Sequence, residues 1–221
     1  MRAVESQDKE DKLLLDALTP IIKSWPSDFC VEANNLAIQV LGGYGYTRDF
    51  PLQQIWRDNR LNMIHEGTAG IQSLDLLGRK TRGEGWGIMV GRMEEAAERC
   101  KSVAGMEEMA AGVREAAEKL EETKVKLLKC MEEDPELALG NSHEFMTMTG
   151  HVVVGWMWLE LATTAAHKLE AGDCDGQEDF YRGQIQAAKW FHVFELGKVA
   201  RMGDVLGGLD RTVVDMKAEW M

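Results

Sequence analysis

The sequence has few prolines and an excess of acidic over basic residues. Only 4 of its 221 residues are proline, so long helices can run with few interruptions. Lysine and arginine together number 25 against 37 aspartates and glutamates, which gives a net charge of −12. Because an acidic chain repels phosphate backbones, this balance argues against nucleic acid as a partner.

Long apolar runs are also missing. The strongest run, residues 152–159, ends at Glu160 and is far shorter than the roughly 18 to 20 residues that a membrane helix needs. The first residues, MRAVESQDKEDK, are polar and lack the apolar centre of a secretory signal. We therefore expect no transmembrane segment and no secretion.

The cysteines are few and widely separated. Cys30, Cys100, Cys130 and Cys174 form no CxxC pair, so neither a structural disulfide nor a zinc site is supported, and we expect no metal. This usage is typical of a reducing compartment. A bacterial cytoplasm and a mitochondrial matrix fit equally well.

The patterning predicts an all-α protein. Hydrophobic residues make up 45% of the chain and charged residues 28%, as in globular proteins, and no sustained period-two alternation indicates strands. Two glycines flank Glu84 in a short charged stretch, where a boundary between domains is expected. We divide the chain there into residues 1–82 and 83–221.

The first part is expected to contain about three helices. Pro20 and Pro26 should bend the first helix or start a new turn within it, and the glycine-rich segment from Gly42 should end it. Pro51 suits the first position of a second helix, and Thr68 is a plausible N-cap for a third. The expected ranges are 9–41, a short helix from 51, and 68–77.

The second part is predicted to be a bundle of about four helices. Apolar residues spaced by three and four from Met109 to Met131 form an amphipathic stripe, which Asp134-Pro135 should break. The following helix, about 143–169, is apolar around much of its circumference and should be central. A last long helix is expected over about 179–200.

Residues 39–80 contain three linked motifs: QVLGGYGYTRDFP, then WRDNR, then HEGTAGIQ. In this order and spacing they closely resemble the C-terminal helical domain of acyl-CoA dehydrogenases, flavin enzymes that introduce an α,β double bond into acyl-CoA thioesters. Residues 141–169, together with DFYRGQIQAAKWFHVFEL and LGGLDRTVVDM, resemble the extra C-terminal domain of the larger members. That branch includes enzymes that act on 3-methylmercaptopropionyl-CoA. One departure is Gln184, where the family usually has a lysine.

The resemblance implies that Glu66 is the catalytic base that removes the proton α to the thioester. A carboxylate suits this role when a dry pocket favours its protonated form. The backbone amide of Glu66 is implied as one donor to the thioester carbonyl. Without the motif, Glu66 would simply complement the dipole of the helix that follows.

The same resemblance implies cofactor and substrate contacts on either side of Glu66. Gly67 is placed against the acyl-CoA substrate, and Thr68, Ala69 and Gly70 against FAD. The adenosine end of FAD bound by a neighbouring subunit is implied to contact Gln39, Val40, Leu41, Gly42 and Gly43, which makes the working enzyme at least a dimer. A plain helix C-cap is the alternative for the glycine pair.

Three further interpretations concern the residues around this motif. Arg57 and Asp58 are interpreted as an ion pair that holds the catalytic loop. His65 is interpreted as a residue that lines the pocket. The tryptophans Trp25, Trp56 and Trp86 are expected in the core.

The resemblance covers only the last third to half of a complete enzyme, and no β-domain is recognisable. One hypothesis is therefore that the chain is a fragment or one half of a split enzyme that needs a flavin-carrying partner chain or sister subunit. It could instead be a non-catalytic structural subunit of a larger assembly, or a module that binds acyl groups without turnover. In each case the outer sides of the first part should be unusually apolar.

Overall fold

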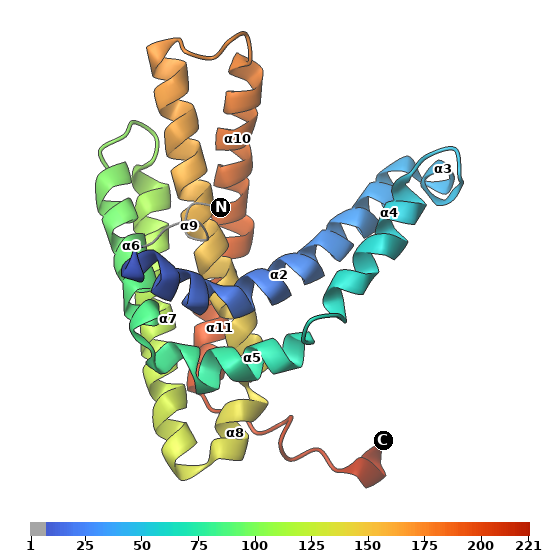
Figure 1. The fold of residues 1–221 in the computed structure, drawn as a ribbon, viewed down its shortest axis with the longest axis vertical. Coiled ribbons are helices and arrows are strands. Elements are labelled where there is room, and N and C mark those ends of the chain that lie inside the picture. Colours follow the sequence, from blue (N-terminus) through green and yellow to red (C-terminus); the bar gives the residue numbers. More distant parts are fainter. Residues whose placement is uncertain (1–7) are drawn as a thin grey trace.

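The computed structural model describes residues 8–221. Every regular element within this range is helical, and no strand occurs in it. The expected all-α class is confirmed. Figure 1 shows an upright bundle of long helices, from which a bent helix and two shorter helices project to one side.

The helices follow closely from local sequence signals. Asp8 caps the first helix, since its side chain accepts a hydrogen bond from the Glu10 amide at 2.8 Å. In the first part, the elements are α2 (Lys9–Leu41), α3 (Gly43–Tyr46), α4 (Leu52–Asn59), η1 (Arg60–Met63), α5 (Ala69–Gly78) and η2 (Lys80–Arg82). The second part contains α6 (Glu84–Cys100), α7 (Glu107–Glu133), α8 (Pro135–Gly140), α9 (Ser142–Ala171), α10 (Glu178–Phe191), η3 (His192–Leu196), α11 (Lys198–Gly207) and η4 (Ala218–Trp220).

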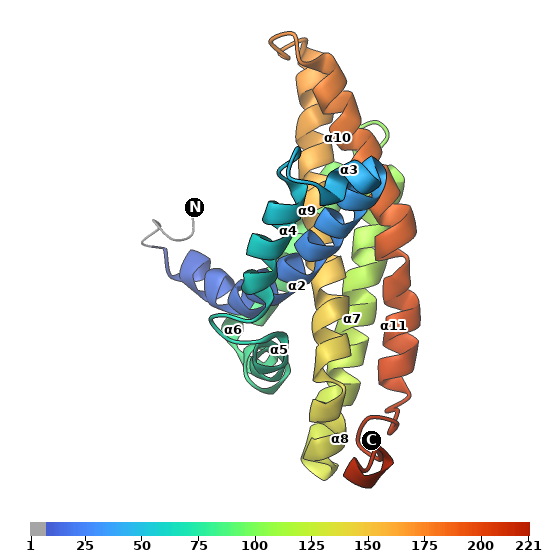
Figure 2. The same cartoon turned by 90° about the vertical axis from the view of Figure 1, so that its right-hand side faces the viewer.

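The bundle consists of α6, α7, α9 and the succession α10–η3–α11, which run side by side along the long axis in both ribbon views (Figures 1 and 2). Helix α9 is buried on several sides, with Phe145, Val152 and Leu159 fully enclosed. The prediction that this helix is central is therefore confirmed. At the end of α7, Asp134 begins the next helix by accepting a hydrogen bond from the Leu137 amide at 3.1 Å.

The last long helix, expected over about 179–200, is present as the succession α10–η3–α11, but it is not α-helical throughout. Residues 192–196 form a π-helical turn between α10 and α11. A Cβ atom at Gly197 would lie 2.8 Å from the carbonyl oxygen of Val193, so the glycine permits the wider turn to rejoin an α-helix. Such turns carry no clear periodicity signal, because they add a single residue to an otherwise regular pattern.

Helix α2 belongs partly to the bundle and partly to the projection. It continues through Pro20 and Pro26, and Figure 1 shows it changing direction along its length, as expected for prolines that remove backbone donors. Its first half buries Ala17, Ile21 and Trp25. Beyond Trp25 no residue of α2 is buried, although the half-buried Phe29 still packs against the core.

Trp25 marks the point where α2 docks on α9. A Cβ atom at Gly150 would lie 1.9 Å from Cδ1 of Trp25, so the indole occupies space that only glycine leaves free. The indole Nε1 lies 3.2 Å from Nδ1 of the buried His151, and Phe29 stacks on Trp25 with ring centroids 3.8 Å apart. These contacts anchor the middle of α2 firmly.

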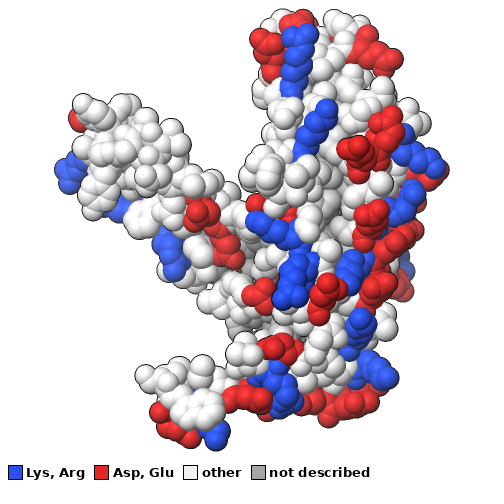
Figure 3. Space-filling view, turned by 180° about the vertical axis from the view of Figure 1, so that it is seen from behind, with Lys and Arg blue, Asp and Glu red and all other residues white. Residues whose placement is uncertain are grey.

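Residues 26–72, here called the arm, contain one buried residue, Gly45. Their apolar side chains instead face outward. The exposed large ones are Leu36, Val40, Leu41, Tyr44, Tyr46, Phe50, Ile55, Leu61, Ile64 and Ile71. Charged side chains are mixed over the bundle but are sparse on the arm in Figure 3. The expectation of an unusually apolar outer surface in the first part is confirmed.

The core does not stop at the expected boundary near residue 83. Leu76 and Leu77 of α5 belong to the same buried cluster as Trp86 and Met89 of α6. The division into residues 1–82 and 83–221 stays a prediction. Across residues 8–221, no helix is both long and apolar enough to cross a membrane.

Candidate functional site

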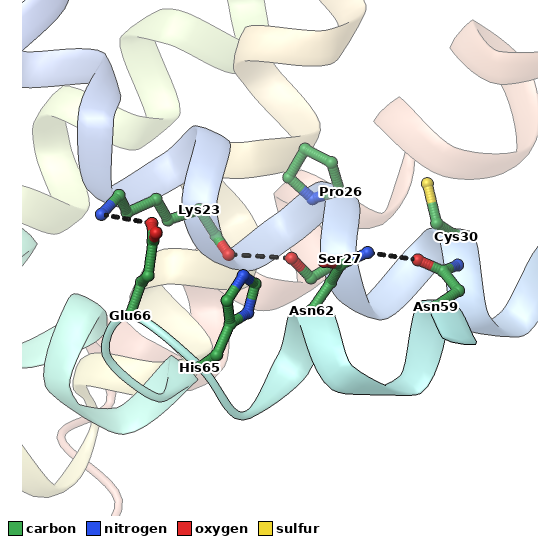
Figure 4. Close-up of a pocket in the computed structure, with 8 residues that line it drawn as sticks. All are labelled: Lys23, Pro26, Ser27, Cys30, Asn59, Asn62, His65 and Glu66. Atoms are coloured by element: carbon green, nitrogen blue, oxygen red, sulfur yellow. Dashed lines mark hydrogen bonds and ion pairs between the residues drawn. The ribbon is translucent and has the colours of Figure 1, made fainter. Parts of the chain in front are cut away.

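A shallow hollow of about 220 Å³ lies between α2 and the segment that leads from α4 to α5. Figure 4 shows the side chains around it. Helix α2 provides Lys23, Pro26, Ser27 and Cys30, and the facing segment provides Asn59, Asn62, His65 and Glu66. The hollow therefore combines hydroxyl, amide, imidazole and charged groups on one face of the junction between arm and bundle.

Glu66 lies at one edge of this hollow. Its Oε2 atom is 3.3 Å from Nζ of Lys23, and its side chain is 67% exposed. Residues 8–221 by themselves therefore do not form the dry pocket that the catalytic interpretation requires. Among these described residues, the hollow is lined by α2 and by the segment that contains Glu66.

The backbone at Glu66 adopts an unusual conformation. Its φ is +54°, in the left-handed region that few non-glycine residues occupy, and Gly67 follows with φ +95°. The side-chain amide of Gln72 donates to the Glu66 carbonyl at 3.2 Å and so supports the turn. Strained backbone of this kind concentrates at functional sites.

The residues after Glu66 open helix α5, as expected. Thr68 is at the N-cap position, as predicted, although its side chain makes no capping hydrogen bond. Thr68 and Gly70 are exposed, and Ala69 is half-buried. The backbone at this end of α5 is thus open to an anionic group, which is what a flavin phosphate requires.

The second predicted cofactor segment lies at the far tip of the arm. Residues 39–43 are all exposed, and Gly42 has φ +58° at the end of α2. In the part of the chain that the structure describes, no atom lies within 4 Å of a Cβ atom built on Gly42 or Gly43. Figure 1 places this tip, beside α3, well apart from the start of α5. The structure does not bring the two segments together, so they cannot hold the same end of one cofactor molecule.

Two interpretations of neighbouring residues need correction. Arg57 and Asp58 are both exposed, and within residues 8–221 no ion pair joins them. Consecutive helical residues point in different directions, which keeps their side chains apart. Trp25 and Trp86 are buried as expected, whereas Trp56 is half-buried outside the main core and its Nε1 has no partner in the described part of the chain.

His65 lines the hollow, as predicted, with Nδ1 3.1 Å from the Leu61 carbonyl oxygen. The sequence interpretation missed the facing side chains. The side-chain amide of Asn62 donates to Oδ1 of Asn59 at 2.8 Å, and the side-chain amide of Asn59 donates to Oδ1 of Asn34 at 3.0 Å. These two hydrogen bonds connect the segment that faces α2 to α2 itself. The spacing of Lys23, Ser27 and Cys30 could have identified one helix face, but not the segment that it meets.

The electrostatics near the hollow are mixed. On α2, burial raises the pKa of the Asp28 carboxyl above its usual value, and the charges of His143 and Arg60 partly oppose this. Cys30 is a free, exposed thiol. Residues 8–221 contain no cluster of three or more histidine, cysteine, aspartate or glutamate side chains arranged to hold a metal.

Both parts of the chain match models of known protein families. Residues 1–80 match the model of the acyl-CoA dehydrogenase C-terminal domain, and residues 89–217 match the model described as acetyl-CoA dehydrogenase C-terminal like.

Three relatives align with most of this chain. A 3-methylmercaptopropionyl-CoA dehydrogenase of Ruegeria pomeroyi is 30% identical over 85% of this chain and 32% of its own length. A broad-specificity linear acyl-CoA dehydrogenase of Mycobacterium tuberculosis is 24% identical over 91% of this chain and 34% of its own length. A butyryl-CoA dehydrogenase of Syntrophomonas wolfei is 25% identical over 97% and 36%. The chain thus spans about a third of the length of these curated relatives.

Proposed function

The chain belongs to the acyl-CoA dehydrogenase family, and from this premise we propose that it is the C-terminal part of an FAD-dependent enzyme that dehydrogenates an acyl-CoA thioester. The observation that carries the proposal is the Glu66-Gly67-Thr68 turn. It combines a left-handed Glu66, an open helix N-terminus and a hollow in one place. Activity is proposed to need a second chain or further domains.

Glu66 is proposed to be the base. Its carboxylate would take the α-proton of the acyl-CoA, and FAD, when bound, would supply the two-electron acceptor for the β-hydrogen. The Cα–H and Cβ–H bonds break and a Cα–Cβ double bond forms. The backbone amide of Glu66 is proposed to donate to the thioester carbonyl, where negative charge develops as the proton leaves.

The binding roles follow the same proposal. Gly67 lies against the acyl-CoA, and the open N-terminus of α5 at Thr68, Ala69 and Gly70 faces FAD. The tip segment 39–43 contacts the adenosine end of a different FAD molecule, held by a sister subunit. The separation of these two segments along the arm supports such an assignment, because one cofactor end cannot occupy both (Figure 1).

The exposure of Glu66 supports the need for a partner. A base that is 67% exposed stays hydrated, and water both competes with the substrate and weakens directed electrostatics. The partner is therefore proposed to cover the hollow and the apolar arm. The assembly is proposed to operate in the cytoplasm of a bacterium or the mitochondrial matrix of a eukaryote.

The first experiment is native mass spectrometry of the chain purified from its own source, with a visible absorption spectrum of the same sample. Flavin absorbance and a second chain of complementary size are expected. Turnover of acyl-CoA by this complex should then be abolished by Glu66→Gln and kept by Glu170→Gln, which alters a distant exposed carboxylate. Normal turnover by the Glu66→Gln complex would refute the role of Glu66.

A second candidate function is a non-catalytic structural subunit that has inherited the fold. The observation in its favour is the same exposed Glu66, since a scaffold needs no dry pocket. Under this alternative the purified chain would be colourless and bound to unrelated proteins. A flavin-carrying partner would eliminate it.

A further inference from the structure

The Glu66 carboxylate has one partner among residues 8–221, the ammonium group of Lys23 at 3.3 Å. Gln72 donates to the backbone carbonyl of Glu66 at 3.2 Å, and the His65 ring lies 3.1 Å from the Leu61 carbonyl oxygen. Among residues 8–221, Lys23 is therefore the residue that makes an ion pair with the carboxylate itself.

Lys23 is itself held in place by the best-anchored stretch of α2. It lies two residues before Trp25, whose indole is fixed against Gly150 and His151. The Ser27 hydroxyl also donates to the Lys23 carbonyl oxygen at 2.9 Å. Figure 4 shows Lys23 and Ser27 along one side of the hollow, with Glu66 opposite Lys23. The ion pair thus connects a fixed point of the core to a strained, exposed turn.

We propose that Lys23 is a positioning residue for Glu66: it directs the carboxylate toward α2 at the edge of the hollow and steadies the left-handed turn. The catalytic significance of this pair rests on the proposed function. The positioning itself is a property of the chain without flavin or substrate. Because both side chains are exposed, the effect is small, roughly two- to fivefold in the population of the paired state.

Zero-length carbodiimide cross-linking of the whole chain tests the pair directly. The reagent activates a carboxylate, and an adjacent amine then displaces it to form an amide. We expect a Lys23–Glu66 cross-link in peptide mass spectra at low salt, and less of it at high salt, where exposed pairs are screened. Glu66→Gln should abolish it. Absence of this cross-link in the unaltered chain would overturn the proposal.

Hydrogen exchange of the amides at residues 65–68 tests the effect on the turn. Lys23→Met is expected to speed exchange about two- to fivefold, and Lys23→Arg, which keeps the positive charge, should restore it. Lys9→Met is the matched control, because Lys9 lies on the same helix as Lys23 but pairs with Glu84 of α6 at 3.5 Å, away from the turn. Unchanged exchange in Lys23→Met would overturn the proposal.

Failure of this proposal and failure of the proposed function can be told apart. Neither cross-linking nor exchange requires flavin, substrate or turnover. If a complex with Glu66→Gln keeps its turnover, the catalytic role of Glu66 is lost but the ion pair stands. If the cross-link is absent while Glu66→Gln abolishes turnover, only the role of Lys23 is lost.

Discussion

The bundle and the arm are both helical, but their apolar side chains are arranged in opposite ways. In the bundle, residues such as Met93, Phe145 and Leu159 are fully buried and form one continuous cluster. In the arm, Val40 is 84% and Tyr46 81% exposed. Both regions have helical periodicity, but the apolar faces of the bundle helices pack against one another, whereas those of the arm are exposed.

This difference suggests how stability and function are divided. The bundle stabilises itself through buried area, and the first half of α2 is attached to it through Trp25. The arm carries the proposed cofactor and substrate residues but contributes almost nothing to the core. Exposed apolar surface of this extent is typical of a site for another protein surface or ligand.

Replacing one phenylalanine in each region should give the largest contrast. Phe145→Ala removes a fully buried ring and should lower the free energy of unfolding by about 3–5 kcal/mol. Phe50→Ala removes a ring that is 40% exposed on the arm and should cost less than about 1 kcal/mol. Urea denaturation measures both. Equal losses would mean that the arm is part of the cooperative core.

The attachment point between the regions can be broken at Gly150. In Gly150→Ala the new methyl group would lie 1.9 Å from the Trp25 ring, and the rigid indole must move, which should cost about 1–3 kcal/mol. Gly183→Ala is the control, because a Cβ atom there has nothing within 4 Å. Thermal and chemical denaturation would measure the difference. A neutral Gly150→Ala would show that Trp25 does not fix α2.

The bundle should also respond to pH through His192. Burial lowers the pKa of this imidazole below its ordinary value of 6.5, and its bond to the Ala188 carbonyl opposes this only partly. As the pH falls, the His192 imidazole is therefore protonated more readily in the unfolded chain than in the folded chain. Stability from this group is complete above about pH 6.5 and is lost as the pH falls toward the folded-state pKa.

Denaturation curves across this pH range would check the sign. His192→Gln, which does not titrate, should reduce the loss of stability on acidification. His167→Gln is the control, because it makes the same substitution at an imidazole that is 59% exposed. An unaltered slope in His192→Gln would contradict the prediction.

The smallest effect on stability, and a larger effect on association, is expected at the tip of the arm. Val40→Asp should change the free energy of unfolding by less than about 0.5 kcal/mol but reduce self-association of the chain in sedimentation experiments. Val125→Asp alters a side chain that is 60% exposed on the bundle and should leave association unchanged. If both variants behave alike, the apolar surface of the arm has no special role.

Local signals in the sequence predicted most of the helices. Asp134-Pro135 ends one helix and begins another, and Gly42 terminates α2, each because of backbone preferences that act within a few residues. The π-helical turn at 192–196 was missed, since it depends on how α10 and α11 pack against their neighbours. The arm's exposed surface was predicted, because the resemblance implied missing partners.

The candidate site was predicted only in part. The motif identified Glu66 and its neighbours in sequence. It did not single out Lys23 and Ser27, which reach the hollow from α2, or Asn59, which lies within the WRDNR motif at the end of α4. It also led to an Arg57–Asp58 ion pair that does not form within residues 8–221, because motif matching carries no side-chain directions.

The helical class, the helix limits set by glycine, proline and capping residues, and the family motif around Glu66 could all be read from the order of the residues. These features depend on short-range backbone energetics or on the order of residues. Tertiary structure alone decided that Trp25 fits over Gly150, that Lys23 meets Glu66, and that the two proposed cofactor segments lie apart. Such contacts join residues distant in the chain, and their geometry is set only when whole helices pack.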